Sequence, residues 1–385
     1  MRRTVFNEDH EAFRETIRDF IAAEVVPVYD QWLQAGQAPR DFYRKLGELG
    51  VFGIEVPEEF GGAGETSFKF QAVITEECAR AGVSFGGSGV HTGLCLPYLL
   101  AYCNDEQKKR WLPDFVSGDM MTAIAMTEPG TGSDLAGMKT TARLSEDGTH
   151  YVLNGAKTFI TGGVHADRVI VCARTAPATP EDRRAGISLL VVDTKSEGYA
   201  VGRKLEKLGL KTSDTAELSF TDVKVPVEDL LGEEGKGFSY LGQNLPQERL
   251  GIAMGAYAQA SAAIAFAKAY VQDRTVFGQS VAAFQNTKFV LADCKAEVDA
   301  AQAVVDRALD AHDAGELTAA DAASAKLFCT EVAARVIDKC LQLHGGYGYM
   351  LEYPIARLYA DNRVNRIYGG TSEVMRSIIA KSMGL

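Results

Sequence analysis

The sequence lacks any cysteine pattern that would form a disulfide framework or a metal site. Its seven cysteines are scattered, odd in number and never spaced as C-x-x-C, which is typical of free thiols in a reducing compartment. The first residues, "MRRTVFNEDHEAF", contain two arginines with no apolar run behind them, so neither a secretory nor a twin-arginine signal is expected. We therefore expect a cytoplasmic protein without a bound metal.

The sequence also lacks the positive charge of a nucleic-acid-binding protein. It carries 40 lysines and arginines against 51 aspartates and glutamates, a formal net charge of −11, whereas a nucleic-acid binder would usually carry a basic footprint. The hydrophobic content of 46% and the charged content of 24% are ordinary for a soluble globular protein. The length of 385 residues predicts two or three domains, each with its own core.

No run of large apolar residues has the length of a membrane span. Residues 250–267 carry no charge over 18 positions, which is close to the length that a membrane crossing needs. Most of these residues are alanine, glycine, serine or glutamine, and few are large and apolar. We therefore expect a buried helix in a tightly packed bundle.

Internal repeats and low-complexity tracts are absent, but the chain changes character twice. Residues 1–120 predict a helical domain, because apolar side chains recur at helical spacing. Residues 121–232 predict an all-β domain with strand-like runs such as "RVIVCAR" and "GISLLVVDT". Helical spacing returns in alanine-rich segments at about 244–273, 284–313 and 318–344, so residues 233–385 predict a bundle of long helices.

Two local signals predict where elements turn or end. Asn154-Gly155 lies between alternating segments in "HYVLNGAKTFITGG", which predicts a β-hairpin turn at this dipeptide. Pro113 lies inside the helical pattern of "NDEQKKRWLPDFVSGD", which predicts that this helix is broken there.

Five glycine-containing motifs could touch a ligand, although each is also compatible with ordinary local structure when taken alone. "AMTEPGTGSD" at 125–134 is a plausible tight turn, "KTFITGG" at 157–163 is strand-like, and "DRTVFG" at 273–278 follows a long helix. "QLHGGYGYM" at 342–350 resembles a helix C-cap, and "RIYGGTSEVM" at 366–375 precedes a final helix. None is a G-x-G-x-x-G fingerprint after a strand in a βαβ unit.

Six motifs in one order are far more specific than any of them alone. They are "TEPGTGSD", "FIT", "RTVFG", the pair Phe284-Gln285, "QLHGGYGY" and "IYGGTSE". With them the chain resembles the acyl-CoA dehydrogenase family over about residues 10–382. The resemblance implies a mainly α fold with a central all-β domain: an N-terminal helical domain, a β-barrel-like middle domain and a C-terminal four-helix bundle. It also implies an FAD-dependent enzyme that removes two hydrogens from the α and β carbons of an acyl-CoA.

The resemblance also implies which residues contact FAD. On the flavin side these come from two motifs of the β domain: Met126, Thr127, Gly132, Ser133, Phe159, Ile160 and Thr161. The pyrophosphate and adenosine half would be bound by a neighbouring subunit, through Arg274, Phe277, Gln285, Gln342, Leu343, His344, Gly345 and Gly346. Thr371, Ser372 and Glu373 would lie near the flavin diphosphate, where a helix N-terminus favours anions. A homotetramer that shares FAD across subunits follows from this arrangement.

The reaction needs a base against the weakly acidic α proton and donors for the developing enolate oxygen. Most of the family carries this base as a glutamate directly after the tyrosine of the last motif, where this chain has Gly369. A minority, the isovaleryl and long-chain types, carry it on an earlier helix in a Glu-Arg pair. The stretch "NLPQERL" supplies such a pair in Glu248 and Arg249, so the resemblance implies Glu248 as the base.

The assignment of Glu248 as the base has two alternatives. Glu248 also fits an ordinary acidic residue in the first turn of a helix, two positions after Pro246. Glu373 is an alternative base, although it lies beyond the Thr-Ser pair on the FAD side of the turn. The substrate side would comprise the neighbours of the base and the polar groups facing the thioester: Ser133, Gln247, Arg249, Gly369 and Gly370.

The resemblance leaves three functions to weigh. The leading one is an acyl-CoA dehydrogenase of fatty-acid β-oxidation, acting on medium to long chains and passing electrons to an electron-transferring flavoprotein. The second is a flavin oxidase or monooxygenase on the same scaffold. The third is a flavin-binding protein that has lost catalysis, which the glycine at 369 favours and Glu248 opposes.

Overall fold

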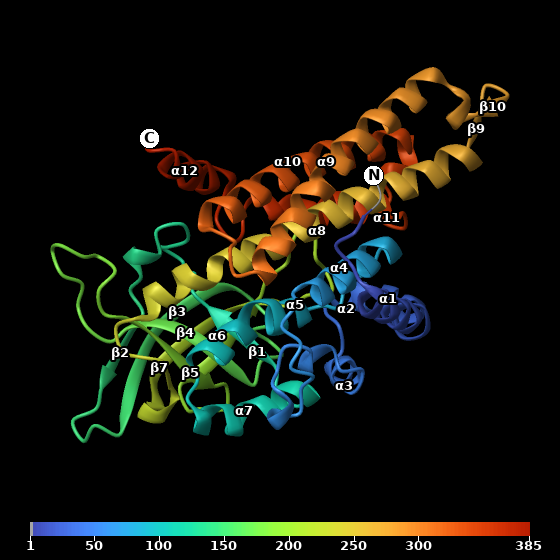
Figure 1. Cartoon of the computed structure of the whole chain (residues 1–385). Coiled ribbons are helices and arrows are strands. Elements are labelled where there is room, and N and C mark those ends of the chain that lie inside the picture. Colours follow the sequence, from blue (N-terminus) through green and yellow to red (C-terminus); the bar gives the residue numbers. More distant parts are fainter. Residues whose placement is uncertain (1–2) are drawn as a thin grey trace.

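The N-terminal part of the chain is helical in the computed structural model, which describes residues 3–385 (Figure 1). Its helices are α1 (Glu8–Phe20), α2 (Tyr29–Ala35), α3 (Arg40–Glu48), α4 (Lys69–Ala81), α5 (Ser88–Val90), α6 (Leu96–Tyr102) and α7 (Asp105–Ser117). Asn104 starts α7 with a capping box that involves Gln107. The expected break at Pro113 is wrong, because α7 continues to Ser117. Pro113 is exposed, so water can reach the carbonyl that lacks its helical donor.

An eight-stranded sheet follows the N-terminal helices. Its strands are β1 (Thr122–Ala125), β2 (Thr141–Leu144), β3 (His150–Thr161), β4 (Arg168–Arg174), β5 (Ile187–Asp193), β6 (Tyr199–Lys204), β7 (Thr215–Pro226) and β8 (Leu230–Leu231). The spatial order is β6-β7-β3-β2-β4-β5-β8, and β1 pairs with β4 in parallel. The strands β4 and β5 are buried along nearly their whole length, which accounts for their continuous apolar runs.

The hairpin expected at Asn154-Gly155 is wrong. Strand β3 runs through this dipeptide and pairs with β2 on one side and β7 on the other. The register with β7 shifts between Leu153 and Gly155, so the glycine lies at a bulge, and the Asn154 amide donates to the Asp222 carboxylate at 2.9 Å. The turn between β2 and β3 instead contains Gly148.

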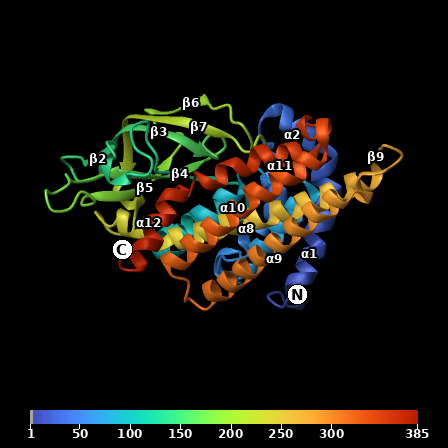
Figure 2. The ribbon, with the colours of Figure 1, turned by 90° about the horizontal axis from the view of Figure 1, so that it is seen from above.

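Five helices form the C-terminal part: α8 (Gly237–Asp273), α9 (Gln285–Asp313), α10 (Ala319–Leu343), α11 (Pro354–Asn362) and α12 (Ser372–Ser382). A short hairpin of β9 (Thr275–Val276) and β10 (Gln279–Ser280) connects α8 to α9. The long helices α8, α9 and α10 lie side by side, with α11 and α12 against them (Figure 2). Small buried residues on α8 let its neighbours approach closely: Ala253, Ala256, Ala260, Ala263 and Ala267.

Helix α8 begins earlier than the sequence pattern predicted. It starts at Gly237 and continues through Pro246, so Glu248 lies about three turns inside the helix. The assignment of Glu248 to a first turn is therefore wrong, because the helix dipole acts only near the ends. By length and composition alone, α8 is the one helix within residues 3–385 that could cross a membrane. Its most apolar stretch is 61% buried inside the protein.

Candidate active site

Glu248 lies directly against Gly369. A Cβ built on Gly369 would be 3.3 Å from Oε1 of Glu248 and 2.4 Å from Cδ1 of Ile252. Glu248 and Ile252 are four residues apart on α8, so they share the helix face that meets this turn. Gly369 has φ +61, a conformation that side chains rarely adopt. A residue larger than glycine at 369 would therefore be strained and would displace both neighbours.

Two cations accompany this carboxylate. Arg249 is buried and its Nε donates to the Gly369 carbonyl at 3.4 Å. Lys326, on α10, is only 1% exposed and its Nζ donates to the Gly370 carbonyl. Burial raises the pKa of Glu248, whereas Arg249 and Lys326 oppose this rise. Burial lowers the pKa of Lys326 to about 8, Arg249 acts in the same direction, and Glu248 opposes both.

The amides of the glycine turn are free to bind a ligand. Among the described residues, the N–H groups of Gly369 and Gly370 donate to no other backbone or side-chain group. Both carbonyls of the turn are already bound by Arg249 and Lys326, which restricts how the peptide units can rotate. A thioester oxygen near the turn would thus meet available donors beside a carboxylate.

The first β-domain motif is held against the third strand by a buried ion pair. Lys157 on β3 donates to the Met126 carbonyl at 3.0 Å and to the Glu128 carboxylate at 2.9 Å. Burial acts to raise the pKa of Glu128, but hydrogen bonds from Thr140 and Lys139 and the Lys157 ammonium bring it below its ordinary value. The Thr158 N–H donates to the Thr127 carbonyl at 2.9 Å. Met126 and Thr127 therefore lie beside the "FIT" motif.

Phe159 is presented to the outside by an irregular strand. It has φ +61 and is 67% exposed, where β3 shifts register against β7 between Lys157 and Ile160. The next residue, Ile160, is buried and Thr161 is partly buried. Backbone strain and a large exposed ring at one residue are typical of a ligand contact. Gly132 and Ser133 are also exposed on the neighbouring loop.

The two hydroxyls at the start of α12, where the diphosphate was expected to lie, are hydrogen-bonded within the protein. Thr371 caps the helix by accepting from the Val374 N–H at 3.3 Å. Ser372 donates to the Glu331 carboxylate at 3.0 Å, and Glu373 is exposed and pairs with Arg376. A small cavity of about 140 Å³ lies here, lined by Arg363, Arg366, Ile367, Thr371, Ser372 and Glu373. Its two arginines add a positive charge that sequence reasoning missed.

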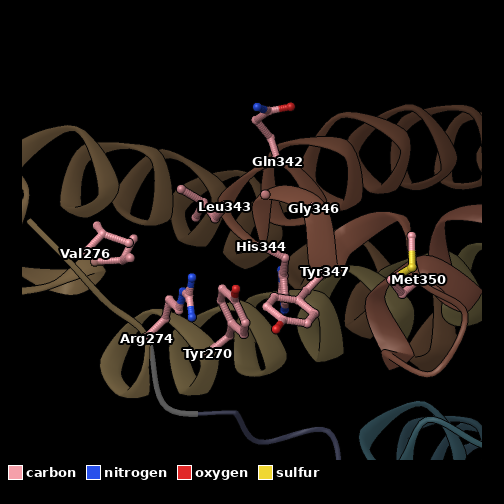
Figure 3. A pocket seen from close by; sticks show the side chains of 11 residues that line it. Tyr270, Arg274, Val276, Gln342, Leu343, His344, Gly346, Tyr347 and Met350 are labelled. Atoms are coloured by element: carbon pink, nitrogen blue, oxygen red, sulfur yellow. The ribbon is translucent and has the colours of Figure 1, made fainter.

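A cavity of about 600 Å³ lies where α8 ends and the β9–β10 hairpin begins (Figure 3). Six residues expected at the adenosine half of FAD line it: Arg274, Gln342, Leu343, His344, Gly345 and Gly346. The His344 ring stacks on Tyr270 with centroids 4.4 Å apart, and Arg274 lies 5.8 Å from the Tyr347 ring centroid. Figure 3 shows these rings gathered beside Arg274, whereas Gln342 points away from them.

Three expected site residues lie elsewhere. Phe277, at the tip of the β9–β10 hairpin, is 95% exposed and Gln285 is the exposed first residue of α9, and neither lines the large cavity. The Gln247 side chain is hydrogen-bonded at 3.2 Å to Nε2 of His312 on α9. Gln247 therefore contacts the bundle in this structure, although it neighbours Glu248 in sequence.

Sequence reasoning missed Lys326, Glu331, Lys157 and Glu128. Lys326 had a readable signal, because it falls on the apolar stripe of its helix between Ala322 and Cys329. A lysine on a buried stripe needs a partner. The other three had no comparable signal, because their partners come from distant parts of the chain. No group of metal-binding side chains occurs in residues 3–385.

Family models match almost the whole chain. The descriptions are acyl-CoA dehydrogenase N-terminal domain at residues 7–119, middle domain at 123–223 and C-terminal domain at 235–384. A long-chain specific mitochondrial acyl-CoA dehydrogenase of Sus scrofa is 43% identical over 381 residues, covering 99% of this chain and 88% of that protein. The chain belongs to the acyl-CoA dehydrogenase family.

Solved structures agree with this membership. An acyl-CoA dehydrogenase from Geobacillus kaustophilus superposes with a TM-score of 0.95 at 46% identity, covering 99% of both chains. An acyl-CoA dehydrogenase from Bacillus anthracis, described as complexed with FAD, has a TM-score of 0.90 at 34% identity, covering 98% of this chain and 67% of that one. The expected fold class is confirmed, and the protein is an FAD-dependent oxidoreductase.

The residues present fit this cofactor. The exposed Phe159 ring can pack against a planar ring, and the two arginines of the small cavity suit a diphosphate. The large cavity offers a guanidinium and stacked aromatic rings, which suit phosphate and adenine.

Proposed function

We propose that this protein oxidises an acyl-CoA thioester to the trans-2-enoyl-CoA, with Glu248 as the base that removes the α proton. The observation that carries this proposal is the 3.3 Å approach of the Glu248 carboxylate to the place where a side chain at Gly369 would begin. The commoner family base would start from that place. The Glu248 carboxylate therefore reaches from α8 the region that a side chain at position 369 would occupy. The identity to a long-chain enzyme supports a preference for medium to long chains in β-oxidation.

The residues divide the work in a simple way. Glu248 accepts the α proton, and its partly buried position strengthens it as a base. The free N–H of Gly369 donates to the thioester oxygen as negative charge develops there. Bound FAD supplies the acceptor for the β hydride. Ser133, Arg249 and Gly370 would border the substrate, whereas Gln247 would have to leave His312 to do so.

We further propose an assembly and an electron acceptor. The turn that precedes Thr371 lies against Glu248, and Arg274 follows the last residue of α8, so about 39 Å of helix separates the two regions at a rise of 1.5 Å per residue between positions 248 and 274. This span is longer than FAD, so one cofactor would meet both regions only with the second from a neighbouring subunit. A homotetramer whose subunits share FAD fits this arrangement. We further propose that it works in the cytoplasm and passes electrons to an electron-transferring flavoprotein.

Anaerobic flavin bleaching tests the function. Purified protein should be yellow, and acyl-CoAs of graded length and branching should bleach it without oxygen, with the largest rate among medium to long chains. A folded protein that neither contains nor gains flavin, or a flavin that no acyl-CoA bleaches, would contradict the proposal. Rapid oxygen consumption during turnover, in place of reduction of an electron-transferring flavoprotein, would favour an oxidase.

A further inference from the structure

The glycine turn of the last motif is bound from two sides by buried cations. Arg249 on α8 donates to the Gly369 carbonyl at 3.4 Å, and Lys326 on α10 donates to the Gly370 carbonyl. Two consecutive carbonyls are therefore held by two different helices. A turn with φ +61 and +93 at its glycines would otherwise be free to move.

Lys326 also lies close to the proposed base. Its Cε is 3.7 Å from the point where a Cβ on Gly369 would be, and Oε1 of Glu248 is 3.3 Å from the same point. A lysine that is only 1% exposed is costly unless it has a partner. Among the described residues, Lys326 donates to a backbone carbonyl and forms no ion pair with a carboxylate inside 4.0 Å. Its hydrogen-bond partner is the Gly370 carbonyl, and Glu248 is the nearby negative charge.

We propose that Lys326 is a positioning residue for Glu248: its ammonium fixes the glycine turn opposite the carboxylate and keeps that carboxylate ionised. This inference rests on the proposed function. Arg249 on α8 and Lys326 on α10 are the cations that face Glu248, and Tyr98 on α6 and Tyr368 beside the turn are the neutral groups. A hydrocarbon at 326 would leave Arg249 as the only facing cation.

The test separates charge from hydrogen bonding. Lys326→Gln keeps a donor for the Gly370 carbonyl but removes the charge, and Lys326→Met removes both. The matched control is Lys339→Met, which removes a partly exposed lysine of the same helix that pairs with Glu297 at 3.0 Å. Each holoenzyme is titrated by infrared spectroscopy, and the protonated carboxyl band of Glu248 is identified by its loss in Glu248→Gln.

Removing an opposite charge raises the pKa of a carboxyl. We therefore expect the titration midpoint of Glu248 to rise by about one pH unit in Lys326→Gln and to stay unchanged in Lys339→Met. The low-pH limb of flavin reduction should move by the same amount. Lys326→Met should show the same rise in the Glu248 midpoint. It should also reduce flavin more slowly at pH values where Glu248 is ionised, because the Gly370 carbonyl has lost its hydrogen-bond donor.

A midpoint in Lys326→Gln that coincides with that of the wild-type protein would overturn the inference. The glutamine variant decides the matter even where the methionine variant does not fold. The infrared titration needs no turnover, so it gives its answer even if no acyl-CoA bleaches the flavin. A flavin that stays unbleached would contradict the proposed function and leave the assignment of Lys326 standing on its own measurement.

Discussion

The surroundings of Glu248 act on its charge in opposite directions. Burial raises its pKa, and the two neighbouring cations limit the rise. Below this pKa the carboxyl is protonated and cannot accept the α proton, so flavin reduction should fall as the pH drops through it. Above this pKa the carboxylate is ionised and can accept the proton. The rate should therefore rise with pH as Glu248 ionises.

Glu248→Gln should remove the proposed base while keeping the size and polarity of the side chain. The loss of a general base typically costs about 10²–10⁴-fold in rate. The rate of anaerobic flavin reduction by acyl-CoA should therefore fall by at least about 100-fold. FAD content and acyl-CoA binding should be nearly unchanged, because neither needs the carboxylate. Stopped-flow measurement of flavin bleaching checks this, and the low-pH limb of the wild-type profile should disappear.

The matched control is Glu373→Gln, an exposed carboxylate at the start of α12. It should retain nearly full activity. If Glu248→Gln keeps more than about a tenth of the wild-type rate, a smaller loss than removal of a general base causes, the base lies elsewhere. A large loss in Glu373→Gln would then point to the alternative that the sequence left open.

At the scale of elements, the position of the proposed base Glu248 depends on how α8 meets the turn before α12. Both Glu248 and Ile252 reach Gly369 from one helix face, and Ile252 Cδ1 would lie 2.4 Å from a Cβ at 369. Glutamate at 369 therefore needs room that this Ile252 methyl occupies. The positive φ of Gly369 adds a further cost of order 1–3 kcal/mol for any other residue.

Moving the carboxylate should work only when that room is made. We expect Glu248→Ala with Gly369→Glu to recover little activity, and addition of Ile252→Val, which removes the obstructing methyl, to recover more. Alanine is used at 248 because the position lies well inside α8, where glycine would weaken the helix. Flavin bleaching rates of the two variants and of Glu248→Ala alone provide the comparison. Equal rates in all three folded proteins would show that the two positions do not address one carbon.

The element types were predictable from the sequence, but several of their details were not. Apolar periodicity correctly predicted the long helices and the buried strands β4 and β5. It failed at Asn154-Gly155, because the pairing of β3 with β7 overrides the turn preference of this dipeptide. The helix boundaries expected near Pro246 and Pro113 were also wrong. Pro246 lies within the long packed helix α8, which continues although proline lacks an N–H donor. Pro113 is exposed, so the carbonyl that lacks its helical donor can face solvent.

The candidate site was predictable only where its residues lie in one continuous segment of the chain. Motifs that lie within one segment, such as Glu248-Arg249 and Gly369-Gly370, could be read directly. The cations and carboxylates that hold those segments come from α10, where Lys326 binds the Gly370 carbonyl and Glu331 accepts from Ser372. Such contacts join residues more than 40 positions apart, and one sequence carries no record of that proximity.

At the scale of the whole molecule, the proposed FAD contacts of one chain fall into two separate groups. The start of α12 and the β9–β10 hairpin lie at opposite ends of the helical bundle (Figure 1). Exposed apolar side chains gather near the large cavity, among them Phe277, Tyr347, Tyr349, Met350 and Leu351. An exposed apolar patch of this kind is expected where a second copy of the chain covers the surface.

Arg274→Ala should therefore weaken FAD retention and assembly together, because the lost guanidinium would contact phosphate across the subunit boundary. The matched control is Arg203→Ala on β6, an exposed arginine that does not line the large cavity. Gel filtration with light scattering, recorded together with flavin absorbance, measures both quantities on the holoenzyme. We expect the Arg274 variant to release FAD on dilution and to lose mass with it, while the control remains a yellow tetramer. A wild-type monomer at micromolar concentration that keeps all its FAD would contradict the shared site, because a single chain would then bind the cofactor without the cavity at the far end of α8.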